Sequence, residues 1–282
     1  RDVAPSRGLG DVYKRQGVKR IDAFLAQPER EILAEEGASM PRGDVVVSHV
    51  TFGYDERTVL RDLSFTVKSG EQVTLVGRTG AGKSTVFKLL MGLYQPKAGT
   101  ITIGGVDIRN IALSHLRGNI GIVLQEPFLF SKSFKDTISD GSNRHDIESV
   151  RKYARLAVID DTIDRFAEGY DTQIGERGVT ISGGQKQRVA IARMLMQNTP
   201  IKIFDDSLSA VDMETDAKIR ESINKNVRGT TILIAHRITT IMNADQIIVM
   251  DKGRIVQRGT HETLSKEDGI YKRIYDTQRS AT

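Results

Sequence analysis

Residues 77–85 carry the pattern G-x-x-x-x-G-K-S-T, a glycine-rich turn that ends in a lysine and two hydroxyl side chains. Residues 72–76 alternate like a buried strand, and residues 86–91 have apolar side chains at helical spacing. In this context such a turn wraps phosphate groups with backbone N–H groups, Lys83 adds a cation and Ser84 gives Mg²⁺ a hydroxyl ligand. The pattern therefore predicts a nucleoside triphosphate site made by Gly77, Arg78, Thr79, Gly80, Ala81, Gly82, Lys83, Ser84 and Thr85.

A second glycine cluster, residues 178–185, precedes another segment with apolar side chains at helical spacing. Ser182 alone could serve as the N-cap of that helix, and a capped helix start is the simpler interpretation. A cap does not need two adjacent glycines behind it, however, whereas a set of N–H donors directed at an anion does. We therefore favour a second anion-binding site, formed by Ser182, Gly183, Gly184 and Gln185.

Charged side chains stand at the ends of two predicted strands. Residues 201–206 read as a buried strand that ends in Asp205 and Asp206. Beside a phosphate loop, Asp205 is the expected partner of Mg²⁺, and Asp206 is placed to act as a base for water. His236 follows the predicted strand 230–235 and is the one histidine expected near the phosphates.

Two further residues are suggested by their positions alone. Gln125 follows the predicted strand 121–124, where an amide could contact the metal ion or its water, although this is a weak signal. Tyr54 lies in the turn between two predicted strands, where an aromatic ring can stack on a purine. An isolated aromatic residue in a turn more often serves packing, so both interpretations of Tyr54 stay open here.

The composition limits the classes of protein to consider. A chain of 282 residues with 39% hydrophobic side chains can bury one large core, in one domain or in a domain with an arm. The absence of cysteine excludes a disulfide framework and a thiolate metal site. No apolar run approaches the roughly 18–20 residues that span a bilayer. The net charge of +5 is spread along the chain, so no nucleic-acid partner is expected.

The first 43 residues differ from the rest. Residues 1–16 lack periodicity and are expected to be a non-native or disordered extension. We favour translated read-through sequence over the alternative, a natural disordered arm. Residues 17–43 predict an amphipathic helix followed by a polar linker. From residue 44 the chain becomes rich in strands, and those that flank the phosphate loop suggest a small antiparallel subdomain.

Taken in order, these residues resemble the nucleotide-binding domain of ATP-binding cassette (ABC) transporters over residues 44–275. The resemblance identifies Tyr54 as the aromatic contact of adenine, Gln125 as the Q-loop residue, Asp212 as the D-loop residue and His236 as the switch histidine. It implies an α/β fold, with a P-loop NTPase core built on a mostly parallel sheet, an antiparallel β subdomain and an α-helical signature subdomain. The implied domain covers residues 44–282, and its helical part about residues 126–185.

In this family two such domains form a head-to-tail dimer, with ATP between the phosphate loop of one and the signature residues 181–185 of the other. The resemblance implies ATP and Mg²⁺ as cofactors and an ATPase reaction by in-line attack of water on the γ-phosphate. The implied metal ligands are Ser84, Gln125 and Asp205. The implied catalytic residues are Lys83, Gln125, Asp206 and His236.

The subfamily resembles exporters. Residues 175–178 are similar to the exporter segment that contacts membrane-domain loops, and the helix near residues 19–21 is similar to the cytoplasmic end of a last transmembrane helix. The chain is therefore expected to be part of a longer polypeptide, with its transmembrane domains elsewhere. The expected place is the cytoplasmic face of a bacterial plasma membrane. A soluble ABC ATPase of translation or repair fits less well, since neither two cassettes nor a long coiled coil is present. An importer subunit fits less well because it would lack the N-terminal helix and the segment of residues 175–178.

Three residues depart from the family pattern. Asp206 stands where a glutamate is usual, and the shorter side chain favours the degenerate half of a heterodimeric exporter. A homodimeric exporter ATPase and a poorly hydrolysing, nucleotide-gated binding subunit remain the alternatives. Ile181 replaces a leucine conservatively. Lys202 falls in a strand that should be buried, and the sequence offers no explanation for it.

Overall fold

Two β-sheets and the helix between them position the ends of the predicted strands. The computed structural model describes residues 38–175, 178–226 and 228–280. The predictions for residues 1–16 and for the amphipathic helix that follows lie outside these residues, as do Glu176 and Arg177 of the exporter-like segment.

The smaller sheet is antiparallel, with the strand order β2-β1-β4-β5. Its strands are β1 (Val45–Phe52), β2 (Leu60–Val67), β4 (Ala98–Ile103) and β5 (Val106–Asp107). In β1, the alternate residues Val45 and Val47 are buried, because successive side chains of a strand point to opposite faces. The antiparallel subdomain expected from the sequence is confirmed.

The larger sheet has the strand order β12-β11-β3-β10-β9-β6. Its strands are β3 (Gln72–Gly77), β6 (Ile120–Val123), β9 (Ile201–Asp205), β10 (Thr230–Ile234), β11 (Gln246–Asp251) and β12 (Arg254–Gly259). β12 pairs with β11 antiparallel, and the other pairs are parallel. The predicted mostly parallel sheet is thus present, and its parallel strands end at one common edge.

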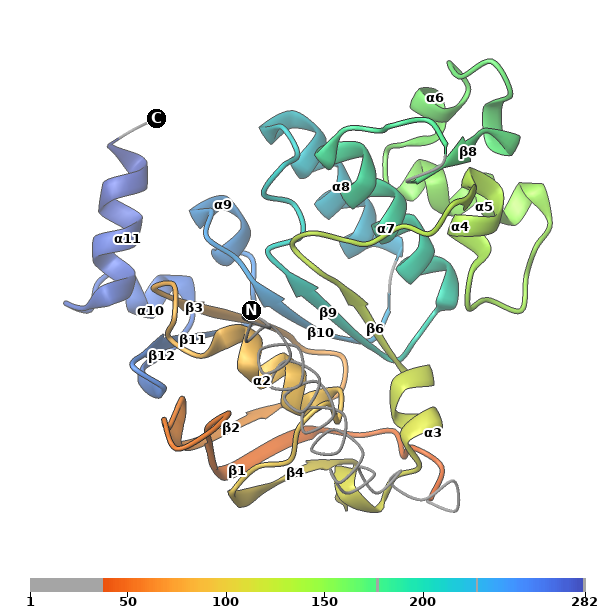
Figure 1. The fold of residues 1–282 in the computed structure, drawn as a ribbon. Helices are drawn as coiled ribbons and strands as arrows, with labels where there is room; N and C mark the ends of the chain where they lie inside the picture. Colours follow the sequence, from red (N-terminus) through yellow and green to blue (C-terminus); the bar gives the residue numbers. More distant parts are fainter. Residues whose placement is uncertain (1–37, 176–177, 227, 281–282) are drawn as a thin grey trace, which may run out of the picture.

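Helix α2 (Lys83–Leu90) lies between the two sheets (Figure 1). Phe87, Leu89 and Leu90 are each 1% exposed and join a first hydrophobic core that includes side chains from both sheets. Burying side chains of this size stabilises the fold by about 1.5–3 kcal/mol each. This packing fixes the start of α2, and with it the phosphate loop, relative to the edge of the larger sheet.

A helical subdomain follows β6 and packs around a second core, which also includes Val123 and Phe204 of the larger sheet. It comprises β7 (Lys132–Ser133), α4 (Phe134–Ser139), α5 (Ile147–Leu156), α6 (Asp160–Ile163), η2 (Gly169–Asp171), β8 (Gln173–Ile174) and α7 (Gly183–Gln197). The α-helical subdomain that the resemblance implies is thus present. The two-residue strands β7 and β8 were not predicted, since so short a pair leaves no period in the sequence.

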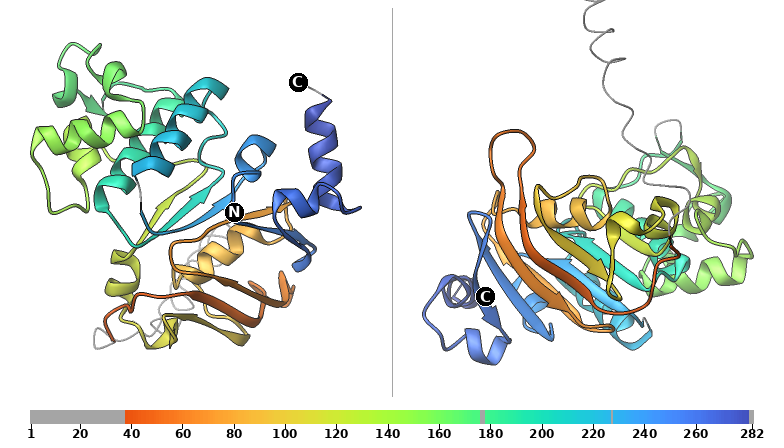
Figure 2. Two further views of the ribbon diagram at one scale, coloured as in Figure 1. Left: turned by 180° about the vertical axis from the view of Figure 1, so that it is seen from behind. Right: turned by 90° about the horizontal axis from the view of Figure 1, so that it is seen from below.

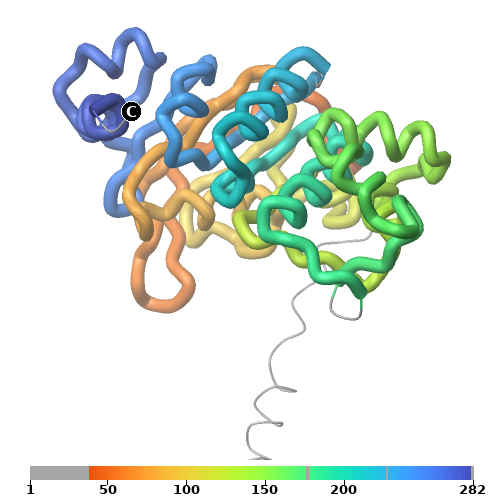
Figure 3. Tube along the Cα trace, turned by 90° about the horizontal axis from the view of Figure 1, so that it is seen from above, coloured from red at the N-terminus to blue at the C-terminus, as the bar shows by residue number. Residues whose placement is uncertain are grey.

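The remaining elements cover the larger sheet or extend from it, except η1, which follows β5 and contacts β4 of the smaller sheet. They are η1 (Ile108–Asn110), α3 (Leu113–Gly118), α8 (Met213–Asn226), α9 (Ile238–Ile241), α10 (His261–Leu264) and α11 (Ile270–Arg279). Helices α7, α8 and α9 lie on the face opposite α2, as Figures 1 and 2 show. Seen from above in Figure 3, the helical subdomain and the helices α10 and α11 lie at opposite ends of the molecule. Across the described ranges, no helix combines the length and apolar character that crossing a bilayer requires.

The structure supplies the missing explanation for Lys202. Its side chain is 1% exposed, and its ammonium group donates to the carbonyl oxygens of Thr199, at 2.5 Å, and Arg228, at 2.8 Å. Burial lowers the pKa of Lys202 below its ordinary value. The buried cation is therefore held by backbone carbonyl groups and has a structural role at the amino edge of the sheet.

Candidate functional site

The carboxyl edge of the larger sheet carries most of the predicted site residues. β3 leads into the phosphate loop, β6 into Gln125, β9 into Asp205 and Asp206, and β10 into His236. Because these strands are parallel neighbours, the residues that follow them meet at one edge. They line a cleft of about 1240 Å³, which we call the strand-end cleft. Its predicted lining residues are Tyr54, Thr79, Gly80, Gly82, Lys83, Ser84, Thr85, Gln125, Asp205, Asp206 and His236.

The glycine loop has the backbone shape expected for a phosphate cradle. Gly77 has φ +155°, and a Cβ there would come within 2.2 Å of the Met250 carbonyl oxygen, so only glycine fits. Lys83 donates from Nζ to the carbonyl oxygens of Gly77, at 2.8 Å, and Arg78, at 3.0 Å. Burial lowers the pKa of Lys83, and the nearby Asp205 and Asp206 oppose that shift. The ammonium group is thus held at the mouth of the loop.

Ser84 and Asp205 offer oxygen atoms side by side. The Ser84 hydroxyl donates to Asp205 Oδ1 at 3.2 Å, and Gln125 lines the same cleft. Burial raises the pKa of Asp205, and the hydrogen bond from Ser84 opposes that rise. Among the described residues no cluster of three His, Cys, Asp or Glu side chains could hold a metal by itself. A hydroxyl beside a carboxylate, with room for phosphate oxygens and water, is a donor set that suits Mg²⁺.

Asp206 occupies an unusual backbone position directly after β9. Its φ is +46°, in the left-handed region that aspartate adopts more readily than most residues. Its N–H donates to the Ile234 carbonyl oxygen at 3.1 Å, which ties this turn to β10. Burial raises the pKa of the Asp206 carboxyl group, and the neighbouring His236, Arg237 and Lys83 act in the opposite direction. A carboxylate with a raised pKa binds a proton more readily and is therefore suited to act as a base.

Tyr54 lies in the β1–β2 turn and is 42% exposed. Its ring makes edge contacts with Phe52 and Tyr94, both at 5.1 Å between centroids. Its hydroxyl lies 3.2 Å from the Thr85 hydroxyl. These contacts fix the ring at the rim of the strand-end cleft, and stacking on adenine stays a prediction.

The second glycine cluster does not line the strand-end cleft. Ser182 caps α7: its hydroxyl accepts from Gln185 N at 3.2 Å, while Ser182 N donates to Gln185 Oε1 at 2.8 Å. The capped helix start is therefore real, and the first turn of α7 carries no acidic residue. The predicted anion site is therefore separate from the cleft that this chain's own phosphate loop lines. Asp212, also outside the cleft, caps α8 by accepting from Thr215 N at 2.9 Å.

Gln187 is a residue that the sequence reasoning missed. It is 2% exposed, and its amide donates to the Gln125 carbonyl oxygen, at 2.9 Å, and accepts from Ala210 N, at 3.1 Å. One side chain thus joins the helix of the second glycine cluster to the strand-end cleft and to the turn before Asp212. Helical spacing could have revealed it, because Gln187 falls on the apolar stripe of α7 with Ile191.

Gln278 was also missed, and no sequence signal could have found it. From α11, its Nε2 donates to the His236 carbonyl oxygen at 2.6 Å, and its Oε1 accepts from Ile238 N at 2.8 Å. Arg237 makes a further tie, because its Nη2 donates to the carbonyl oxygens of Ser209, at 3.3 Å, and Val211, at 3.0 Å. The backbone around His236 is therefore held from two sides.

Known proteins share both the sequence and the fold. A family model described as ABC transporter matches residues 60–209. An uncharacterized ABC transporter ATP-binding protein, YfiB, of Bacillus subtilis (strain 168) is 43% identical over 274 residues, covering 96% of this chain and 45% of that protein. An ATP-dependent lipid A-core flippase of Syntrophus aciditrophicus (strain SB) is 38% identical over 265 residues, covering 93% of this chain and 44% of that protein.

A solved structure, of a bacterial Atm1-family ABC exporter with ATP bound, superposes with a TM-score of 0.86 at 40% identity. The match covers 96% of this chain and 49% of the solved chain. The chain therefore spans about half the length of these relatives.

Proposed function

The chain belongs to the ABC transporter family as a nucleotide-binding domain of the exporter type, and we propose that it binds Mg²⁺-ATP, hydrolyses it and so powers export across a membrane. The observation that carries this proposal is the strand-end cleft, where Lys83, Ser84, Asp205, Asp206 and His236 meet. Those residue types combine phosphate binding, metal binding and acid–base chemistry in one place.

The binding step uses the phosphate loop and the Ser84–Asp205 pair. Backbone N–H groups of the loop and Nζ of Lys83 bind the β- and γ-phosphates, with Lys83 exchanging a carbonyl contact for a phosphate contact. Ser84, Asp205 and Gln125 would hold the magnesium ion, which, when bound, neutralises charge on the phosphate oxygens. The ring of Tyr54 would support the adenine base.

The hydrolytic step uses Asp206 and His236. Asp206 accepts a proton from the attacking water, and burial, which raises its pKa, strengthens it as a base. His236 binds the γ-phosphate from the end of β10 and orients it. Because aspartate is one methylene shorter than glutamate, its carboxylate stands back from the water, and a misplacement of about 1 Å costs on the order of 10²-fold in rate.

ATP turnover by the wild-type chain and by Asp206→Glu tests this assignment, at a protein concentration that permits pairing. We expect glutamate to raise turnover about tenfold or more, since it extends the base toward the water. The matched control is Lys83→Ala, which should abolish turnover in both backgrounds. Substantial wild-type turnover that glutamate leaves unchanged would instead favour a homodimeric exporter with a competent aspartate.

A second nucleotide-binding domain is the proposed partner. Ser182, Gly183 and Gly184, at the capped start of α7, lie outside this chain's own cleft, and no acidic side chain in the first turn opposes an anion. The positive end of a helix at that place suits the γ-phosphate held by another domain. Asp206 supports a heterodimer in which this chain completes the active site of its partner.

Transmembrane domains are the other proposed partner, at the cytoplasmic face of a membrane. Phe128 and Phe130, between β6 and β7, are 60% and 57% exposed, and their rings pack edge-on at 5.1 Å. Gly175, which begins the exporter-like segment, lies against the backbone of Phe130, where a Cβ would approach the Phe130 carbonyl oxygen to 3.0 Å. An exposed aromatic pair beside that segment is the kind of surface that a protein partner covers.

A poorly hydrolysing, nucleotide-gated binding subunit is the second candidate, and Asp206 is the observation that favours it. Such a subunit would bind Mg²⁺-ATP and pair while hydrolysing it at a negligible rate. If Asp206→Glu gains no turnover although ATP drives dimer formation, this candidate replaces the ATPase.

A further inference from the structure

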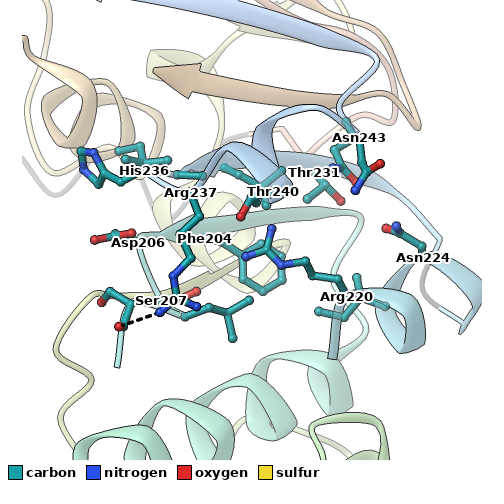
Figure 4. A pocket seen from close by; sticks show the side chains of 17 residues that line it. Phe204, Asp206, Ser207, Arg220, Asn224, Thr231, His236, Arg237, Thr240 and Asn243 are labelled. Carbon is teal, nitrogen blue, oxygen red and sulfur yellow. Dashed lines mark hydrogen bonds between the residues drawn. The ribbon is translucent and has the colours of Figure 1, made fainter. Parts of the chain in front are cut away.

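A second cavity lies on the opposite face of β9 and β10 from helix α2, under α8 and α9; we call it the rear cavity. Its volume is about 140 Å³. Asp206, Ile234 and His236 line both the rear cavity and the strand-end cleft, so they form the wall between the two. Figure 4 shows Asp206 and His236 at one end of the rear cavity, and Thr231 and Asn243 at the other.

The body of the rear cavity is apolar. Strand alternation turns Phe204 of β9 and Leu233 of β10 toward this face, while their neighbours Ile203 and Ile232 join the first core. Ile223 of α8 lines the cavity from the other side. These side chains leave space for a compact apolar group, since an apolar cavity of about 150 Å³ in a protein holds benzene.

Three buried polar groups at this cavity have no partner. They are the hydroxyls of Ser207 and Thr240 and the Nη1 group of Arg220; Ser207 is 2% exposed and Thr240 is 5% exposed. The described residues contain six such buried side-chain atoms, and half of them line this one cavity. Native proteins leave few buried polar groups unpaired, so three such groups at one cavity suit a ligand that forms hydrogen bonds. All three groups can donate a hydrogen bond, so they fit an acceptor.

The charges around the cavity favour a negative acceptor. Asp216 accepts from Arg220 Nε, at 2.7 Å, and Nη2, at 2.6 Å, which leaves Nη1 free for the cavity. Asp216 also accepts from Arg237 Nη1 at 3.2 Å. Two guanidinium groups thus share this carboxylate. Asp206, a carboxylate of the cavity lining, lies with His236 at the end of the cavity away from Arg220, so the charge around the Nη1 group of Arg220 is complementary to an anion.

We propose that the rear cavity binds a small monocarboxylate with a compact aromatic or branched aliphatic body. The carboxylate accepts hydrogen bonds from Arg220, Thr240 and Ser207, and the body packs against Phe204, Ile223 and Leu233. Because Asp206 and His236 lie in the shared wall, an occupant contacts the backbone that positions the proposed base and the proposed γ-phosphate ligand. An occupant of the rear cavity is thus able to change the rate of ATP hydrolysis by shifting Asp206 and His236.

Benzoate is the probe that tests this site, with binding to the full chain measured by calorimetry and no nucleotide present. We expect saturable binding, with benzamide, which has the same shape and no charge, binding at least tenfold more weakly. Thr240→Val removes one donor without changing the shape, and should weaken benzoate binding about fivefold or more. Ile223→Trp fills the cavity and should abolish the binding.

The matched control is Thr74→Val, which removes another buried, unpartnered hydroxyl, one that does not line the rear cavity. It should leave benzoate binding unchanged. Lack of benzoate binding by the wild-type chain would overturn the proposal and assign water to the three donors. Binding that ATP displaces and that Thr240→Val does not weaken would also overturn it, because benzoate would then occupy the strand-end cleft.

Discussion

The ammonium group of Lys202 lies at the amino edge of the larger sheet, opposite the edge that carries the site. A buried cation loses the hydrogen bonds that water would give it. The two carbonyl contacts of Lys202 replace those hydrogen bonds. Asp206 follows the other end of β9. Burial disfavours the charged form of both groups, so it raises the pKa of Asp206 and lowers that of Lys202. At the scale of single residues, burial is thus the main influence on both ends of this strand.

Lys202→Met tests the lowered pKa of Lys202. The unfolded chain holds this proton with the ordinary pKa of 10.5 and the folded chain holds it less tightly, so the unfolded chain binds more protons between the two values. The free energy of unfolding of the wild-type chain should therefore rise with pH relative to that of the variant. Urea unfolding from about pH 7 to about pH 10 measures the difference. A difference that stays constant over this range would show that burial does not weaken proton binding here.

At the scale of elements, the C-terminal helix α11 supports the loop after β10. The two hydrogen bonds of the Gln278 amide reach the backbone on either side of Arg237, across 40 or more residues of sequence. Together with the Arg237 contacts to the turn before Asp212, they hold the His236 backbone in place. An element outside the motifs thereby positions a residue within them.

Gln278→Ala should lower the kcat of ATP hydrolysis severalfold and change the KM for ATP by less than about twofold. The Gln278 amide bonds to the backbone of His236 and Ile238, which lie outside the phosphate loop, and each lost hydrogen bond contributes only about 0.5–1.5 kcal/mol to stability. Thr277→Ala, which removes a hydroxyl that bonds within α11, is the matched control. Equal kcat in both variants, with only thermal stability lost, would give Gln278 a purely structural role.

Spacing along the chain predicted the strands and the site that follows them, because buried parallel strands are runs rich in β-branched residues, such as residues 230–234. Gln187 was within reach of the same reasoning, since it lies on the apolar stripe of its helix. The roles of Gln278 and the rear cavity could not be predicted in this way. Both depend on how elements distant in the sequence pack together, and the spacing of apolar residues carries no information about that packing. Ser182 shows the opposite case: one residue supports two compatible interpretations, a cap and an anion site, and packing establishes only the cap.

At the scale of the whole molecule, the two glycine-rich turns lie at separate places on one copy of the chain. The first lines the strand-end cleft, and the second begins α7 outside it. A single copy therefore presents one half of each of two proposed ATP sites, and complete sites require pairing. A change of charge at the start of α7 should therefore affect the pairing of two domains rather than ATP binding by one copy.

Gly183→Asp tests this division. Gly183 is exposed, and a Cβ there meets nothing closer than Ala210 Cβ, at 3.7 Å, so the new side chain fits. An acidic residue in a first helical turn stabilises the helix by about 0.3–1 kcal/mol. We expect intact folding and ATP binding, but no ATP-dependent dimer, because the carboxylate repels the γ-phosphate held by the partner. Sedimentation in the Asp206→Asn background measures dimer formation.

Gly183→Asn is the uncharged control of nearly equal size and should retain most of the dimer. Dimers that form equally well with aspartate and asparagine would exclude an anion site at the start of α7.

The separate cores have a consequence for the order in which the molecule opens. The helical subdomain contributes α4 and α5 to the second core, which includes only a few side chains of the larger sheet, among them Val123 and Phe204. Amide hydrogens of α5 should therefore exchange with solvent through a cooperative opening of that subdomain, at a lower free energy than those of β3 and β10. The helical subdomain can therefore change its orientation while the amide hydrogens of the larger sheet, which carries the strand-end cleft, stay protected from exchange with solvent.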